Sequence, residues 1–201
     1  MGEKLVFQPL TREDKITVVL YRAGIMMSTT VIVGLSYLLM TVSENTDTAL
    51  ISLSGDILAY VLYVSVGMSV FFIHLYVGKI KQYLKNLFFI SLGCLALLLY
   101  LGKGSVAGAL VQVPYSPLLL LPISGCLGFV TAKEAFCFKL FEGYLLAMIM
   151  PLYLLLVANH SLTGHGVSYG LVLIAVMLVI FTLRKVIMPI AYDIGDKSAY
   201  Q

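Results

Sequence analysis

Four charged side chains and a cysteine lie close together in the segment 131–142. They are Lys133, Glu134, Cys137, Lys139 and Glu142. Ionisable groups among apolar residues of a membrane protein are costly, and by default they are candidates for a functional site. Lys139 and Glu142 can pair at a helical spacing of three, whereas the adjacent Lys133 and Glu134 point about 100° apart. These residues predict a polar site that faces the interior and binds a polar or anionic ligand.

An ordinary interfacial loop explains the same segment without any ligand. Lysines beside the cytoplasmic ends of spans orient a membrane protein, and the rings of Phe136, Phe138 and Phe141 are suited to the headgroup level. Glu134 and Glu142 contribute nothing to orientation. These two carboxylates therefore keep the binding interpretation open. Cys137, between two phenylalanines, is a candidate for thiol chemistry or a small apolar residue.

Two prolines, Pro122 and Pro151, fall within neighbouring apolar segments. A proline inside a helix removes a backbone hydrogen bond and predicts a kink. Broken helices in transporters expose backbone groups to a ligand or ion, so this pair is the best indication of a transport path. Proline is also frequent in membrane helices that have no such role. Between the two prolines, Ser124, Gly128 and Ala132 recur every four residues and predict close helix packing.

The histidines predict no metal site. His160 and His165 are five residues apart, which is the wrong spacing for two ligands on one helix face. His74 could bind the iron of a haem or the metal of a chlorophyll-type pigment, or be an ordinary interfacial histidine. The residues specify no cofactor. They also contain no nucleophile–base pair and no nucleotide-binding motif, so an enzyme is the least favoured class and no catalytic residue is assigned.

The composition determines what must position these groups. Of the 201 residues, 60% are hydrophobic and 11% charged, against about 25% charged in a soluble domain. A span needs about 20 apolar residues, and six candidates are present. They are Arg22–Met40, Ile57–Val77, Leu87–Leu101, Pro117–Ala132, Gly143–Ala158 and Val167–Leu183. We expect an all-α polytopic membrane bundle in a single domain over residues 1–201, with 102–117 either a plain loop or a re-entrant segment.

The basic residues indicate an orientation for this bundle. Twelve of the thirteen lysines and arginines flank one side of the six spans, and Lys103 alone falls on the other. The positive-inside rule then places both tails, 1–15 and 189–201, in the cytoplasm, and the protein in the cytoplasmic (inner) membrane. A short surface helix is expected to start near Thr11 and lead into the first span. Arg22, which opens that span, can snorkel and needs no special role.

The run Lys133-Glu-Ala-Phe-Cys-Phe138, followed by Glu142 and Pro151, resembles a family of bacterial integral membrane proteins, domain of unknown function 2301, with relatives in cyanobacteria. The similarity covers most of the chain. The resemblance implies a multi-pass membrane protein of unassigned activity. It supplies no catalytic residues.

Two functions follow as hypotheses. The first is a membrane binding or assembly protein that holds lipid, pigment or a membrane partner, including a second copy of itself. The second is a small transporter or permease for an ion or small molecule. The chain has few charged groups at mid-span, where coupled transporters usually place them, and this favours the first hypothesis. No soluble basic face is present, so no nucleic-acid partner is expected.

Overall fold

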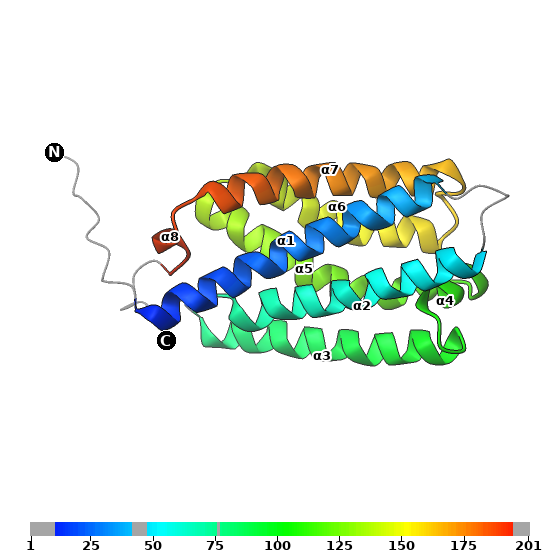
Figure 1. The fold of residues 1–201 in the computed structure, drawn as a ribbon, viewed down its shortest axis with the longest axis horizontal. Coiled ribbons are helices and arrows are strands. Elements are labelled where there is room, and N and C mark those ends of the chain that lie inside the picture. Colours follow the sequence, from blue (N-terminus) through cyan, green and yellow to red (C-terminus); the bar gives the residue numbers. More distant parts are fainter. Residues whose placement is uncertain (1–10, 42–47, 76, 195–201) are drawn as a thin grey trace.

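Six long apolar helices lie side by side in the computed structural model (Figure 1), which describes residues 11–41, 48–75 and 77–194. Within these residues, all regular structure is helical, and six helical segments are long and apolar enough to cross a membrane. The long helices are α1 (Arg12–Thr41), α2 (Thr48–Phe72), α3 (Gly78–Leu101), α5 (Leu121–Phe138), α6 (Phe141–Ala158) and α7 (His165–Ile187). The short ones are α4 (Val106–Gln112), the 3-10 helix η1 (Ser116–Leu120) and α8 (Ala191–Ile194). The predicted all-α, six-span membrane bundle is confirmed.

The first helix begins well before the apolar stretch that predicted it. The Thr11 hydroxyl accepts a hydrogen bond from the Asp14 amide at 3.2 Å, and the Asp14 carboxylate accepts one from the Thr11 amide at 2.9 Å. This reciprocal arrangement is a capping box, which stabilises a helix start. The polar lead-in and the first span therefore form one continuous helix.

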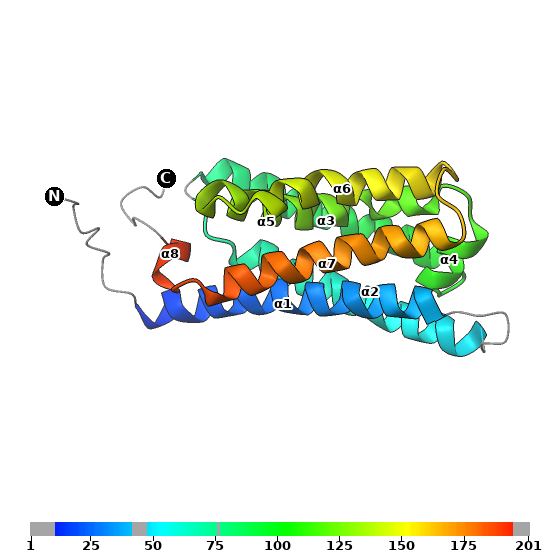
Figure 2. The ribbon, with the colours of Figure 1, turned by 90° about the horizontal axis from the view of Figure 1, so that it is seen from above.

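Small residues set the distances between helices. A Cβ atom on Gly24 of α1 would lie 2.5 Å from the Ser69 hydroxyl oxygen and 2.6 Å from the Ser65 carbonyl oxygen, both on α2. Only glycine allows this approach. On α5, a Cβ on Gly128 would lie 3.4 Å from the Cα of Ala147 on α6. Gly128, a member of the predicted small-residue face of the fourth span, thus lies at the contact with α6. The helices α5 and α6 lie side by side (Figure 2).

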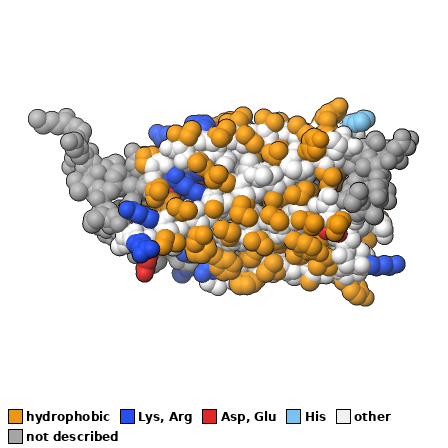
Figure 3. Space-filling view, in the orientation of Figure 1, with side chains coloured by type: hydrophobic (Ala, Val, Ile, Leu, Met, Phe, Trp, Pro, Cys, Tyr) orange, Lys and Arg blue, Asp and Glu red, His pale blue; other side chains and the backbone are white. Residues whose placement is uncertain are grey.

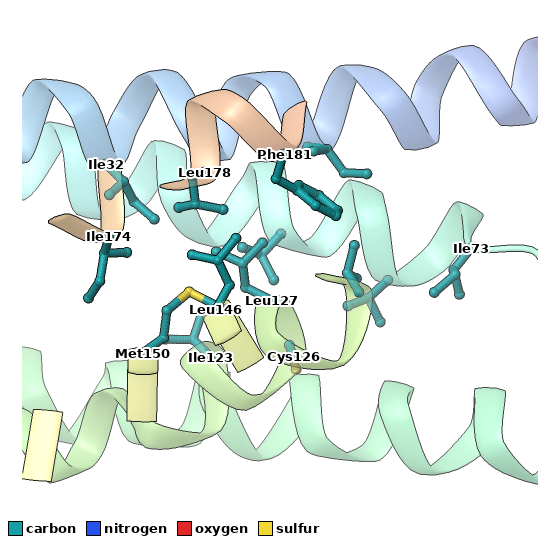
Figure 4. Packing of buried hydrophobic residues seen from close by; sticks show 14 of the residues in the cluster. Ile32, Ile73, Ile123, Cys126, Leu127, Leu146, Met150, Ile174, Leu178 and Phe181 are labelled. Carbon is teal, nitrogen blue, oxygen red and sulfur yellow. The ribbon is translucent and has the colours of Figure 1, made fainter. Parts of the chain in front are cut away.

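The core joins both halves of the chain. Apolar side chains from α1, α5, α6 and α7 meet along the bundle axis (Figure 4). Leu127, Leu146, Leu178 and Phe181 are fully or almost fully buried there. On the face shown in Figure 3, hydrophobic side chains are also spread over the middle of the outer surface. Helices satisfy their own backbone hydrogen bonds, so such a surface suits a hydrocarbon environment.

The segment 102–117 contains α4 and the start of η1. Ser105 caps α4 by accepting a hydrogen bond from the Gly108 amide at 2.8 Å. The Asp56 carboxylate of α2 accepts another from the Ala107 amide, also at 2.8 Å. Leu98 of α3 packs with Val106 and Ala109 of α4 in a small cluster of their own. This segment is therefore fastened to α2 and α3 and covered by protein on that side, as a re-entrant segment must be.

Candidate functional site

Five charged side chains from four helices alternate in sign at one end of the bundle. In order of contact they are Lys133, Glu134, Lys185, Asp193 and Arg22, and we call this set the charge chain. The Lys133 ammonium lies 2.7 Å from Glu134 Oε1, and an Arg22 guanidinium nitrogen lies 2.6 Å from Asp193 Oδ2. Lys185 bridges the two carboxylates. Glu134 and Lys185 are both 0% exposed, so the centre of the charge chain is inaccessible to water.

The C-terminal half of α5 supplies the first two members. Lys133 and Glu134 were expected to point apart, and this expectation is wrong at the level of the charged atoms. The long lysine side chain turns over its own helix and reaches the neighbouring carboxylate. Tyr21 of α1 donates a second hydrogen bond to the same oxygen of Glu134, at 2.6 Å. The Lys133 ammonium also lies 5.4 Å from the centre of the Tyr21 ring, within cation–π range.

Arg22 supplies the far end of the charge chain, and the expectation that it only snorkels is wrong. Its guanidinium donates hydrogen bonds to the carbonyls of Val186, Met188 and Pro189 at 2.7–3.2 Å. The last carbonyls of a helix have no partner within that helix, and these donors satisfy carbonyls at and just beyond the end of α7. Arg22 also donates to Asp193 through Nε at 2.7 Å. The sequence feature that could have indicated this buried role of Arg22 is its position directly before the apolar residues of the first span.

Lys185 is the central member of the charge chain, and the sequence indicated only an orienting role for it. It lies on the last turn of α7 with its ammonium 4.0 Å from the centre of the Phe138 ring. Its neighbours Leu183 and Val186 are apolar, which is the pattern that could have identified it as buried. Asp193 gave no such signal, because it follows the last span within a mixed polar tail.

The other predicted site residues lie outside the charge chain. Glu142 does not pair with Lys139. Both of its carboxylate oxygens accept hydrogen bonds from Arg184, at 2.7 and 2.8 Å. Lys139 ends α5 in the left-handed conformation, with φ 56°, and its side chain is exposed. The helix break there separates it from Glu142, which lies on α6. Cys137 is also exposed.

The two prolines occupy different positions in their helices. Pro122 lies in the first turn of α5, where its missing amide interrupts no helical hydrogen bond. Pro151 lies inside α6. The kinks and the transport path inferred from these prolines stay predictions.

His74 lies near the charge chain, in the connection between α2 and α3. Its Nε2 is 3.2 Å from the Thr17 hydroxyl oxygen, and its Nδ1 is buried without a hydrogen-bond partner in the described part of the chain. Burial lowers the pKa of the imidazole, and the nearby ammonium groups of Lys133 and Lys81 lower it further. A neutral histidine therefore lies beside the charge chain.

Residues 68–201, more than half of the chain, match a family described as uncharacterized integral membrane protein (DUF2301). The chain belongs to the DUF2301 family. The resemblance seen in the run that begins at Lys133 is thereby confirmed. No curated protein and no solved structure matches the chain. The matched range contains four members of the charge chain of this DUF2301 protein, whereas Arg22 precedes it.

The charge chain allows two kinds of chemistry. Its three cations share two carboxylates, so the charge chain carries a net charge of +1. Buried charges are tolerated when each is paired, so the excess cation favours binding of an anionic group. Contiguous ionisable groups at membrane depth also occur as proton relays.

Proposed function

We propose that this DUF2301 protein is a membrane binding protein that holds the anionic group of a ligand at the charge chain. The observation that carries this proposal is the net charge of +1 of this buried set, in which three cations share two carboxylates. An anion that joins the chain removes the imbalance in surroundings of low polarity, where charge compensation is strongest.

Both ends of the charge chain are slightly exposed. The side chain of Lys133 is 9% exposed and that of Arg22 is 10% exposed, whereas that of Glu134 is 0% exposed. The apolar outer surface of the bundle continues to the end that holds the charge chain, where the side chain of Phe136 is 79% exposed. An amphiphile can therefore place an apolar body along the helices and an acidic group at the charge chain. Membrane lipids have this form.

We further propose that the charged end faces the cytoplasm and that the protein lies in the cytoplasmic membrane. Every lysine and arginine of the described residues except Lys103 lies toward the end of the bundle where α1 begins (Figure 3). The positive-inside rule supports this orientation. A membrane-impermeant maleimide applied to intact cells should label Lys103→Cys and leave Lys79→Cys unlabelled. The reverse pattern would overturn the orientation.

The binding proposal is tested by native mass spectrometry of protein purified gently from its own membrane. The wild type should carry an added mass with a phosphate or carboxylate group. Lys133→Ala should lose that mass, and the matched control Lys79→Ala, at an exposed lysine of the same end, should keep it. A bare wild-type chain, or a mass that Lys133→Ala retains, would overturn the proposal. A second polypeptide or a second copy would instead assign the protein to assembly.

One observation favours a small transporter as the second candidate. The Tyr21 hydroxyl, Glu134, Lys185 and Asp193 form continuous contacts across four helices, as in a proton path. Under this alternative, Glu134→Gln abolishes a proton or solute flux in proteoliposomes while the protein still inserts. Glu142→Gln, at a separate and more exposed ion pair, is the matched control and should leave the flux unchanged.

A further inference from the structure

We propose that Asp193 is a built-in occupant of an anion site formed by Arg22 and Lys185, and that a phosphate group of the ligand takes its place. This inference rests on the proposed binding function and assigns both the site and the chemical class of the ligand. The Asp193 carboxylate is 5% exposed and contacts both cations at once. It therefore occupies the position that an external anion would take.

The two cations are held in place without Asp193. Arg22 is fixed by the carbonyls of Val186, Met188 and Pro189, which precede α8. Lys185 is fixed by Glu134 of α5 and by the ring of Phe138. Each cation thus retains partners from the long helices or their ends when the Asp193 carboxylate leaves. A preorganised pair of cations is what an anion site requires.

Asp193 reaches this site from a short and separate element. It lies on the four-residue helix α8, which follows the turn at Pro189. The hydrogen bonds that Arg22 makes to the end of α7 all precede α8, so α8 can withdraw while they persist. The side chain of Ile194, 2% exposed, is the apolar anchor that must be released with Asp193.

The balance of charge selects phosphate. Without Asp193, the remaining members of the charge chain are three cations and Glu134, with a net charge of +2. A phosphate monoester carries about 1.5 to 2 negative charges at pH 7 and can neutralise this net charge, whereas a carboxylate supplies one. The guanidinium fork of Arg22 also matches phosphate oxygens in a bidentate geometry.

Asp193 competes with the ligand because it is tethered beside the site. A group on a short tether acts at an effective concentration in the millimolar range. Replacing its carboxylate with an amide removes the charge that competes while leaving a side chain of similar size. Asp193→Asn should therefore bind phosphate more tightly than the wild type does.

The test uses the full chain in phosphatidylcholine nanodiscs, titrated with inorganic phosphate and followed by calorimetry. We expect Asp193→Asn to bind at least about tenfold more tightly than the wild type, because the tethered competitor is gone. Asp56→Asn, the same substitution at the opposite end of the bundle, should bind like the wild type. In a parallel titration, phosphatidic acid replaces part of the phosphatidylcholine. This titration distinguishes a lipid headgroup from a free phosphate compound as the source of the phosphate. A response to the lipid alone assigns a lipid headgroup, and a response to inorganic phosphate assigns a free phosphate compound.

A second measurement needs no substitution. In the wild type, hydrogen exchange of the backbone amides at 190–194 reports on α8, where the Asp193 amide donates to the Ile190 carbonyl at 3.1 Å. Saturating phosphatidic acid or inorganic phosphate should raise this exchange several-fold without raising that of α4. Equal affinities of Asp193→Asn and wild type for both inorganic phosphate and phosphatidic acid would overturn the inference, as would exchange in the wild type that neither ligand changes. An added mass that still depends on Lys133 would then leave the proposed binding function standing.

Discussion

Each end of the bundle uses a carboxylate to fasten a short helix, but the two carboxylates do so in opposite ways. At the charged end, Asp193 lies on the short helix α8 and its partners, Arg22 and Lys185, lie on the long helices α1 and α7. At the other end, Asp56 lies on the long helix α2 and its partner is the backbone amide of Ala107 on α4.

The interaction of Asp56 is therefore a single hydrogen bond, whereas that of Asp193 belongs to a set of linked ion pairs. The Ala107 amide needs one acceptor, and Asp56 satisfies it without involving another ion. In the charge chain each inner member serves two partners, so removing one leaves others buried and unpaired. The charged end should therefore be the more sensitive to substitution and the one that responds to ligands.

The largest effect is expected for Lys185→Met. This change leaves Glu134 and Asp193 buried without their shared cation, and breaking a buried ion pair costs about 3–5 kcal/mol. The free energy of unfolding, measured in detergent, should fall by that amount. Lys79→Met at an exposed lysine of the same end is the control and should change it by less than about 0.5 kcal/mol. Similar values for the two variants would mean that membership of the charge chain confers no special sensitivity to substitution.

A smaller effect is expected at the opposite end for Asp56→Ala. The loss of one charge-assisted hydrogen bond to a backbone amide should lower the free energy of unfolding by about 1–3 kcal/mol. The increase in hydrogen exchange should be confined to α4, because no other charged member depends on Asp56. Exchange that spreads to α7 or α8 would contradict a local fastening.

The sequence alone predicts the helices of this fold but not the partners of its charges. Apolar runs of nearly 20 residues specify a membrane helix whatever surrounds them, so all six spans follow from local composition. The small-residue repeat that contains Gly128 likewise predicts a close helix contact, because it is a property of one helix face.

The charge chain depends on which helices become neighbours, and this information is not local. Arg22 and Asp193 are separated by 171 positions in the sequence and meet only because α1 packs against α7. Glu134 was identified because its charge has no role in orientation. Lys185 was missed because the positive-inside rule already explained it. When the positive-inside rule already accounts for a lysine, the sequence gives no reason to expect a further role for it in a buried ion pair.

The pH dependence of stability offers a finer comparison, through His74. Its pKa is lowered in the folded protein by burial and by Lys133 and Lys81, while Asp193 and Asp14 act weakly in the opposite direction. The unfolded chain therefore binds the proton first, and stability is lost as pH falls below the ordinary histidine value of about 6.5. His74→Gln should flatten the stability profile below about pH 6.5. His160→Gln, at the opposite end and exposed, should leave the profile unchanged.

The smallest effect is expected for Arg184→Gln, and it sharpens the comparison because Arg184 is the immediate neighbour of Lys185. Arg184 pairs with Glu142 alone, and its side chain is 52% exposed. An exposed pair is screened by water and salt, so the free energy of unfolding should fall by about 0.2–1 kcal/mol, and by less at high salt. Arg184 and Lys185 have the same charge and lie at the same end of α7, but only Lys185 is buried. Comparing the two variants therefore shows whether burial, rather than position in the fold, determines the loss of stability. A loss as large as that of Lys185→Met would mean that the whole charged end acts as one unit, and that membership of the charge chain confers no special sensitivity.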